Sequence, residues 1–182
     1  MHTTIRAAAA AALALAGLLM AGCAQQGQAQ AAASDSAAAP AQTPVQRGQY
    51  LVAIMGCSDC HTPGGLGPKP DTARFLGGSD VDFVMPGMGV FSQPNLTPDK
   101  ATGLGGWTTQ QIVTAFTTGK RPDGRILAPA MPWSDFARLT PEDAAAIALY
   151  LQSLPAVVHK VPGPAADRPC VPKALQCLVQ RE

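Results

Sequence analysis

Apolar residues recur at helical spacing in three segments of the chain. In the first segment, Gly48, Leu51, Val52 and Met55 are spaced i, i+3, i+4 and i+7, so they would share one face of a helix. This pattern predicts a helix that runs directly up to Cys57.

The second segment has Thr108 and Gln111 at the spacing of a capping box, and Gly119 stands where a helix would stop. Its apolar face consists of Ile112, Val113 and Phe116. We expect this helix to span residues 109–118.

The third segment has the clearest start, because Thr140 precedes Pro141 and two acidic residues follow, where they favour the positive end of the helix dipole. Its apolar stripe consists of Ala144, Ile147, Ala148, Leu151 and Leu154. We expect this helix to end before Pro155.

The stretches between these segments are rich in glycine and proline, notably Gly77-Gly78 and residues 85–89. Such stretches exclude long helices and central strands. We therefore expect an all-α domain of three or more short helices with long loops. Aromatic residues make up only 5% of the chain, so a large apolar cofactor would have to complete the core.

The five residues Cys57-Ser58-Asp59-Cys60-His61 form the pattern Cys-x-x-Cys-His, which attaches a c-type haem. On a helical turn, Cys57 and Cys60 share a face and can bond the two vinyl groups of one porphyrin, while His61 is placed beneath the iron. Only one such motif occurs, so we expect one covalently bound haem c. The alternatives are a reducible cysteine pair and half of a zinc site, but the sequence has no second Cys/His pair at metal spacing.

The first 22 residues have the composition of an export signal, because Arg6 is followed by an apolar stretch too short to span a membrane. Leu19-Met20-Ala21-Gly22-Cys23 resembles the lipobox of bacterial lipoproteins, which implies a lipid on Cys23 that tethers the protein to a membrane. The alternative is cleavage nearby, with Cys23 a spare thiol. The expected order is a signal peptide (1–22), a flexible Ala/Gln-rich linker (23–44), one haem domain (45–162) and a tail (163–182).

Two cysteines remain in the tail, Cys170 and Cys177. In the oxidising periplasm they would pair as a disulfide, and the alternative is two separate thiols.

Seven motifs follow one another along the chain. They are Arg47-Gly48-Gln49-Tyr50-Leu51-Val52-Ala53, Gly56-Cys57-Ser58-Asp59-Cys60-His61-Thr62, Pro94-Asn95-Leu96-Thr97-Pro98-Asp99, Gly105-Gly106-Trp107-Thr108, Arg121-Pro122-Asp123-Gly124-Arg125, Pro129-Ala130-Met131-Pro132-Trp133 and Leu149-Tyr150-Leu151. Together they resemble the class I c-type cytochromes, and more narrowly the cytochrome c subunits of membrane-bound alcohol and gluconate dehydrogenases. The single haem motif departs from the multi-haem members. The resemblance implies that the first and last helices cross near Gly48, with Tyr50 or Leu51 against Leu149 or Tyr150.

The resemblance also implies that Met131 is the second axial ligand, in a buried segment 128–132. A thioether on the iron favours the reduced state and raises the reduction potential. The competing ligands are Met85 and Met88, in a Gly/Pro-rich loop, and Met55, whose place on the helical stripe favours core packing. A further competitor is His159, which would give bis-histidine ligation and otherwise is expected at the surface beyond the last helix.

Other motif residues have two interpretations. Trp107 either donates a hydrogen bond to a haem propionate or packs in the core. Asn95 and Thr97 are expected to order a loop near the haem edge, while Arg125 either neutralises a propionate or is solvated. Lys69, Lys120 and Arg121 are candidates for a docking face.

These features predict a periplasmic, membrane-tethered electron carrier, not an enzyme. It would take single electrons from a dehydrogenase or respiratory complex and pass them to an oxidase or another cytochrome. The alternative is a haem enzyme or gas sensor with an open or displaceable ligand position; a copper-binding lipoprotein is opposed by His61 and the matching motifs. The formal net charge of +1 gives no support for nucleic-acid binding.

Overall fold

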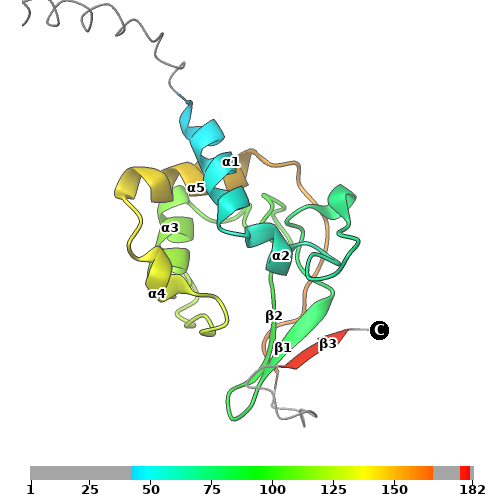
Figure 1. Ribbon diagram of the computed structural model, residues 1–182. Helices are drawn as coiled ribbons and strands as arrows, with labels where there is room; N and C mark the ends of the chain where they lie inside the picture. The colour runs from blue at the N-terminus through cyan, green and yellow to red at the C-terminus, as the bar shows by residue number, and fades with distance from the viewer. Residues whose placement is uncertain (1–41, 166–176, 181–182) are drawn as a thin grey trace, which may run out of the picture. The chain divides into compact units, whose positions relative to one another are not determined.

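The computed structural model describes residues 42–165 and the backbone of residues 177–180. Its helices are α1 (Pro44–Ile54), α2 (Cys57–His61), α3 (Thr109–Thr118), α4 (Trp133–Phe136) and α5 (Pro141–Ser153), with a short 3-10 helix η1 (Thr72–Arg74), and its strands are β1 (Val81–Met85), β2 (Gly89–Ser92) and β3 (Cys177–Gln180) (Figure 1). The predicted signal peptide, Cys23 and Cys170 lie outside the described residues, so the lipid anchor and the disulfide stay predictions. Among the described helices, none is long and apolar enough to cross a membrane.

The three predicted helices are present as α1, α3 and α5. The prediction that the first helix runs directly up to Cys57 is wrong, because α1 ends at Ile54 and Gly56 turns the chain before α2. The capping box of Thr108 and Gln111 starts α3, which ends at Gly119 in the left-handed region with φ 74°. The Thr140 side chain accepts a hydrogen bond from the backbone at the start of α5, and Pro141 occupies the first turn. Local capping therefore accounts for where these helices begin and end.

Helix α1 crosses α5 at Gly48, as predicted (Figure 1). A Cβ at this position would collide with the Ala146 carbonyl and would lie 2.8 Å from the Tyr150 Cβ. Only glycine allows the two backbones to approach this closely. Of the side chains expected around this crossing, Tyr50 and Leu149 are exposed, whereas Leu51 is buried in the core and Tyr150 packs against it.

The apolar core lies mainly among α1, α3 and α5. Its buried members are Leu51, Val52, Leu76, Leu104, Ile112, Phe116, Ala144, Ile147, Ala148 and Leu151. Most of them belong to the three predicted apolar faces, which confirms those helical patterns.

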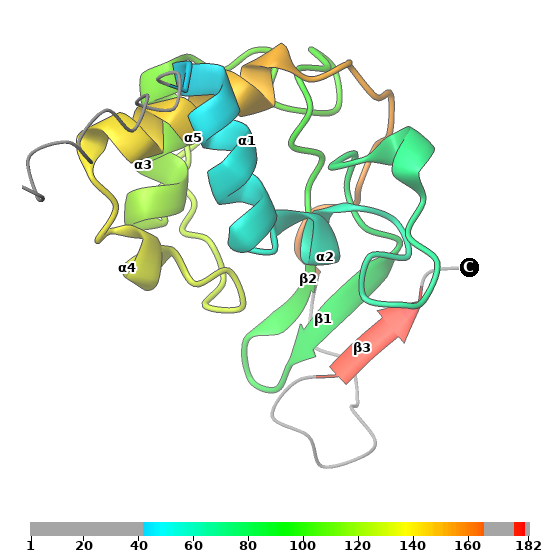
Figure 2. The same cartoon turned by 45° about the horizontal axis from the view of Figure 1, so that its top comes forward.

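The prediction of an all-α fold is wrong for residues 81–92. They form an antiparallel hairpin in which Phe83 lies opposite Phe91, and β3 pairs with the other edge of β1, giving the order β2-β1-β3 (Figure 2). The glycine- and proline-rich residues 85–89 were expected to exclude central strands, but they form the turn that follows the central strand β1. Gly87 and Gly89 have φ values of 76° and 120°, which allow the chain to reverse tightly.

The chain beyond α5 returns to this hairpin. Val90 and Ala165 exchange two backbone hydrogen bonds of 3.0 Å, so the chain at Ala165 lies along the edge of β2 that faces away from β1. Segments that follow the last helix therefore flank both edges of the hairpin.

Candidate haem site

A cavity of about 760 Å³ is lined by both the helices and the hairpin. Its lining includes all five residues predicted to bind haem, which are Cys57, Cys60, His61, Trp107 and Met131. They come from segments more than 70 residues apart in the sequence. The cavity is within the range of cofactor pockets, roughly 300 to 1,000 Å³. Folding thus brings two thiols, an imidazole and a thioether to one mostly apolar space.

The two cysteines lie on α2, which starts directly after Gly56 turns the chain with φ 64°. Burial raises the pKa of the Cys57 thiol to about 11 and also raises the pKa of Cys60. A reducible, reactive pair needs a lowered thiol pKa, so this environment opposes that alternative. Among the described residues no group of three or more His, Cys, Asp or Glu side chains can hold a metal ion, and the zinc alternative gains no ligands there.

His61 is buried and is held by one hydrogen bond of its ring and one of its backbone. Its Nδ1 lies 2.8 Å from the Pro94 carbonyl oxygen; because a carbonyl only accepts, Nδ1 is the protonated nitrogen. Burial lowers the pKa of His61, which keeps the ring neutral and leaves the lone pair on Nε2. The His61 carbonyl accepts a 2.8 Å hydrogen bond from the Gly78 N–H. A neutral imidazole oriented through its other nitrogen is the form that binds a metal.

Met131 lies in a turn whose exposure differs from the prediction. Met131 itself is half-buried and packs against the core, but Pro129 and Pro132 are exposed, so the expected burial of residues 128–132 is wrong. The segment lines the cavity on one side and faces outward on the other, which explains why part of it is exposed.

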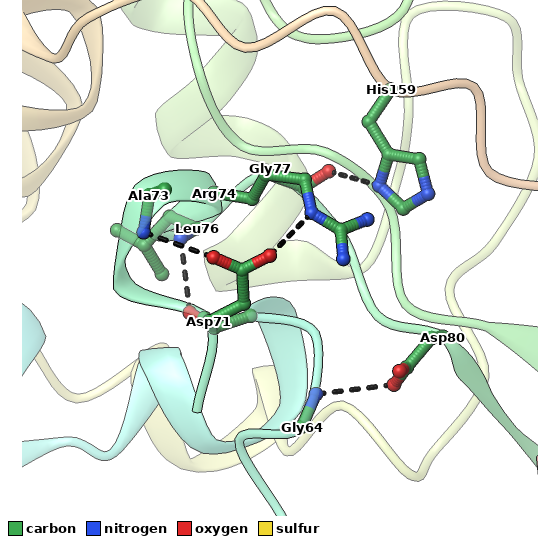
Figure 3. A network of polar contacts seen from close by, with 9 residues as sticks. Gly64, Asp71, Ala73, Arg74, Leu76, Gly77, Asp80 and His159 are labelled. Atoms are coloured by element: carbon green, nitrogen blue, oxygen red, sulfur yellow. Dashed lines mark hydrogen bonds and ion pairs between the residues drawn. The ribbon is translucent and has the colours of Figure 1, made fainter. Parts of the chain in front are cut away.

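Of the competing ligands, Met85, Met88 and His159 do not line the cavity, whereas Met55 lines it and also packs against the core. Met85 ends β1 opposite Gly89, and Met88 is 53% exposed in the hairpin turn. His159, expected at the surface, is half-buried, and its Nδ1 lies 2.8 Å from the Gly77 carbonyl oxygen (Figure 3).

Trp107 packs against the core as well as lining the cavity. The Arg121 guanidinium lies 5.0 Å from the centre of a Trp107 ring, a cation-π distance. Arg121 and Arg125 also line the cavity, and both bond Asp123, at 3.4 and 2.8 Å. Arg121 therefore lies over the indole and Arg125 lines the same cavity, while Lys69 and Lys120 are exposed.

Asn95 and Thr97 are buried and order the loop after Pro94, in line with the prediction. The Asn95 Oδ1 accepts hydrogen bonds from the Thr97 backbone N–H (2.9 Å) and hydroxyl (2.7 Å). The Asn95 Nδ2 donates to the Val157 carbonyl at 2.7 Å, so this loop is also bonded to the chain beyond α5.

Two parts of the cavity wall were missed by sequence reasoning. Phe83 and Phe91 line it from the hairpin, and residues 161–164 line it from the chain beyond α5. The β-branched and aromatic residues in Val81-Asp82-Phe83-Val84, followed after Met85 by Pro-Gly, were an available strand-and-turn pattern. Residues 161–164 have no comparable local pattern.

A mostly helical domain with this set of thiols, imidazole and thioether around one cavity has the construction of a c-type cytochrome. The family comparison agrees: the cytochrome c family model matches residues 45–155, and the chain belongs to this family, which implies a covalently bound haem c.

The chain is similar to the fructose dehydrogenase cytochrome subunit of Gluconobacter japonicus, with 36% identity over 109 residues, or 60% of this chain and 21% of the relative. It is 33% identical over 103 residues to the cytochrome c subunit of a quinone alcohol dehydrogenase of Gluconobacter oxydans, covering 57% of this chain and 20% of the relative. A diheme cytochrome c-type protein of Cereibacter sphaeroides is 29% identical over 123 residues, covering 68% of this chain and 38% of the relative. The chain thus spans from about a fifth to two fifths of these relatives. They agree with the prediction of an electron-transfer protein rather than an enzyme.

Proposed function

We propose that this protein is a monohaem c-type cytochrome that carries single electrons. In this proposal Cys57 and Cys60 bond the haem, and His61 and Met131 are its axial ligands. The observation that supports it is the one cavity lined by all four side chains.

The chain's own residues have separable roles in such a carrier. When bound, haem supplies an iron that alternates between Fe(III) and Fe(II). The Pro94 carbonyl orients the His61 ring through Nδ1. Met131 presents a thioether, and the apolar lining excludes water, both of which favour the reduced state.

We further propose a dehydrogenase or respiratory complex as the electron donor, and an oxidase or another cytochrome as the acceptor. The support is that relatives of this chain bear the names of cytochrome subunits of fructose and alcohol dehydrogenases. A lipid on Cys23 would hold the domain at a membrane facing the periplasm. Replacing Cys23 with Ser should release the protein to the soluble periplasmic fraction; retention in washed membranes would contradict the anchor.

A second function has one observation in its favour. Met131 lies in a partly exposed segment, so a displaceable ligand would let a small molecule reach the iron, as in a haem enzyme or gas sensor.

Optical spectra of the purified oxidised, reduced and CO-treated reduced protein separate the two functions. For a carrier, we expect wild-type spectra unaffected by CO, and a Met131→Ala variant that loses the methionine-to-iron band and binds CO. Met88→Ala, at an exposed methionine, is the matched control and should match wild type. Ready CO binding by the wild type would favour the second function, and an unchanged Met131→Ala spectrum would show that the iron is ligated elsewhere.

A further inference from the structure

Residues 157–165, here called the strap, cover one side of the cavity. In Figures 1 and 2 the strap is the orange segment that leaves α5 and reaches the hairpin. Its residues Val161, Pro162, Gly163 and Pro164 line the cavity. The match to the cytochrome c family model ends at residue 155, so the strap lies outside the matched residues.

Buried side chains hold the start of the strap. The Val157 N–H donates to the Thr97 hydroxyl at 3.0 Å, and the Val157 carbonyl accepts from the Asn95 amide at 2.7 Å. The His159 N–H donates to the Thr102 hydroxyl at 3.1 Å. These three bonds attach the strap to the loop that begins at Pro94, whose carbonyl orients His61.

Its middle and end are held as well. The His159 ring bonds the Gly77 carbonyl at 2.8 Å (Figure 3), and the Val161 side chain occupies the space where a Cβ on Gly78 would lie. Ala165 then exchanges two 3.0 Å backbone bonds with β2. Because the Gly78 N–H bonds the His61 carbonyl, this packing places the strap on the His61 side of the cavity.

We propose that the strap shields the haem pocket from water on the His61 side and so raises the reduction potential; this rests on the proposed haem-binding function. Oxidation leaves the iron site with one more positive charge, and water stabilises that charge better than apolar groups do. Val161, Pro162 and Pro164 offer apolar surface there instead of water. His159 and Val161 are positioning residues, since they act by keeping this wall closed.

The test compares the same substitution at two strap positions. Val161→Thr keeps the side-chain shape and adds a hydroxyl at the cavity wall, while Val158→Thr does so at a residue that is 82% exposed. We expect a lower midpoint potential in Val161→Thr and an unchanged one in Val158→Thr. His159→Phe keeps a ring but removes the bond to Gly77. We expect it to lower the potential and to speed amide exchange at Ala165 by about three- to tenfold.

The outcomes separate this proposal from the function on which it rests. If Val161→Thr and His159→Phe both contain covalent haem and have the wild-type reduction potential, the proposal about the strap is overturned but the proposed haem binding is not. A lowered potential with loss of the methionine-to-iron band would also overturn the proposal about the strap, because the change would then lie at Met131. Wild-type protein without covalent haem would overturn both proposals. If His159→Phe does not fold, the matched threonine pair decides.

Discussion

The two walls that present candidate iron ligands are built differently. His61 is buried, and its ring bonds a carbonyl 33 residues away. Met131 is half-buried, and its backbone bonds join it to Ala128 and Trp133, which are within three residues. A wall assembled from distant segments opens only when those segments separate, whereas a local turn opens at a smaller free-energy cost. We therefore expect the Met131 wall of the cavity to open more readily than the His61 wall.

The largest effect is expected from removing the covalent anchor on the His61 side. Cys57→Ala or Cys60→Ala should leave little folded holoprotein, because the bound haem would complete a core that has few aromatic residues. Haem staining and circular dichroism of the purified fraction measure this. Normal yields of folded, colourless protein would contradict it.

A smaller loss is expected from Asn95→Ala, which loosens the loop behind His61. The substitution leaves the Thr97 N–H and the Val157 carbonyl without their Asn95 partners. We expect the free energy of unfolding to fall by about 2 to 4 kcal/mol, measured by denaturant titration. Gln110→Ala, at an exposed helix position, is the control and should change it by less than about 0.5 kcal/mol. Equal losses in the two variants would count against a rigid His61 wall.

On the other wall, Met131→Ala should cost less stability while changing the spectrum more. Truncating a half-buried methionine in a local turn is expected to cost about 1 to 2 kcal/mol, below the range for fully buried methionines. The same denaturant titration measures it. A loss larger than that of Asn95→Ala would reverse the proposed difference between the walls.

The smallest effect is expected from Arg47→Ala. Arg47 lies on α1 and does not line the cavity. Arg47 bonds both carboxylate oxygens of Asp143, at 2.8 and 3.0 Å, and this hydrogen bonding lowers the pKa of Asp143 below its ordinary value of 3.8. A lowered folded-state pKa adds stability above the unfolded value, and that stability is lost as pH falls through the folded value.

The wild type should therefore have a slightly higher thermal midpoint than Arg47→Ala near neutral pH, and the difference should shrink below about pH 4. Thermal unfolding over this pH range measures it. Arg138→Ala, at an exposed arginine, is the control. A difference in thermal midpoint that grows as the pH falls would contradict the expected direction of the pH dependence. A change in the haem spectrum would show that Arg47 lies nearer the haem than expected.

The predicted and the missed parts of the molecule differ in the range of the interactions that form them. α3 and α5 were predictable because a cap, a proline or a glycine within a few residues sets each end. The bond between His159 and Gly77 joins residues 82 apart, and no local pattern marks it. The hairpin falls between these cases, since its turn is local but β3 pairs from almost 100 residues away.

The sequence by itself determined the haem attachment motif and the three main helices. The spacing of Cys57, Cys60 and His61 within one turn defines a haem attachment motif, and short-range periodicity defines α1, α3 and α5. Only the tertiary structure decided that Met55 and Met131, but not Met85 or Met88, line the cavity, and that residues 161–164 line it as well. Those features depend on packing between segments far apart in the chain, and pairings over such distances leave no periodicity for the sequence to display.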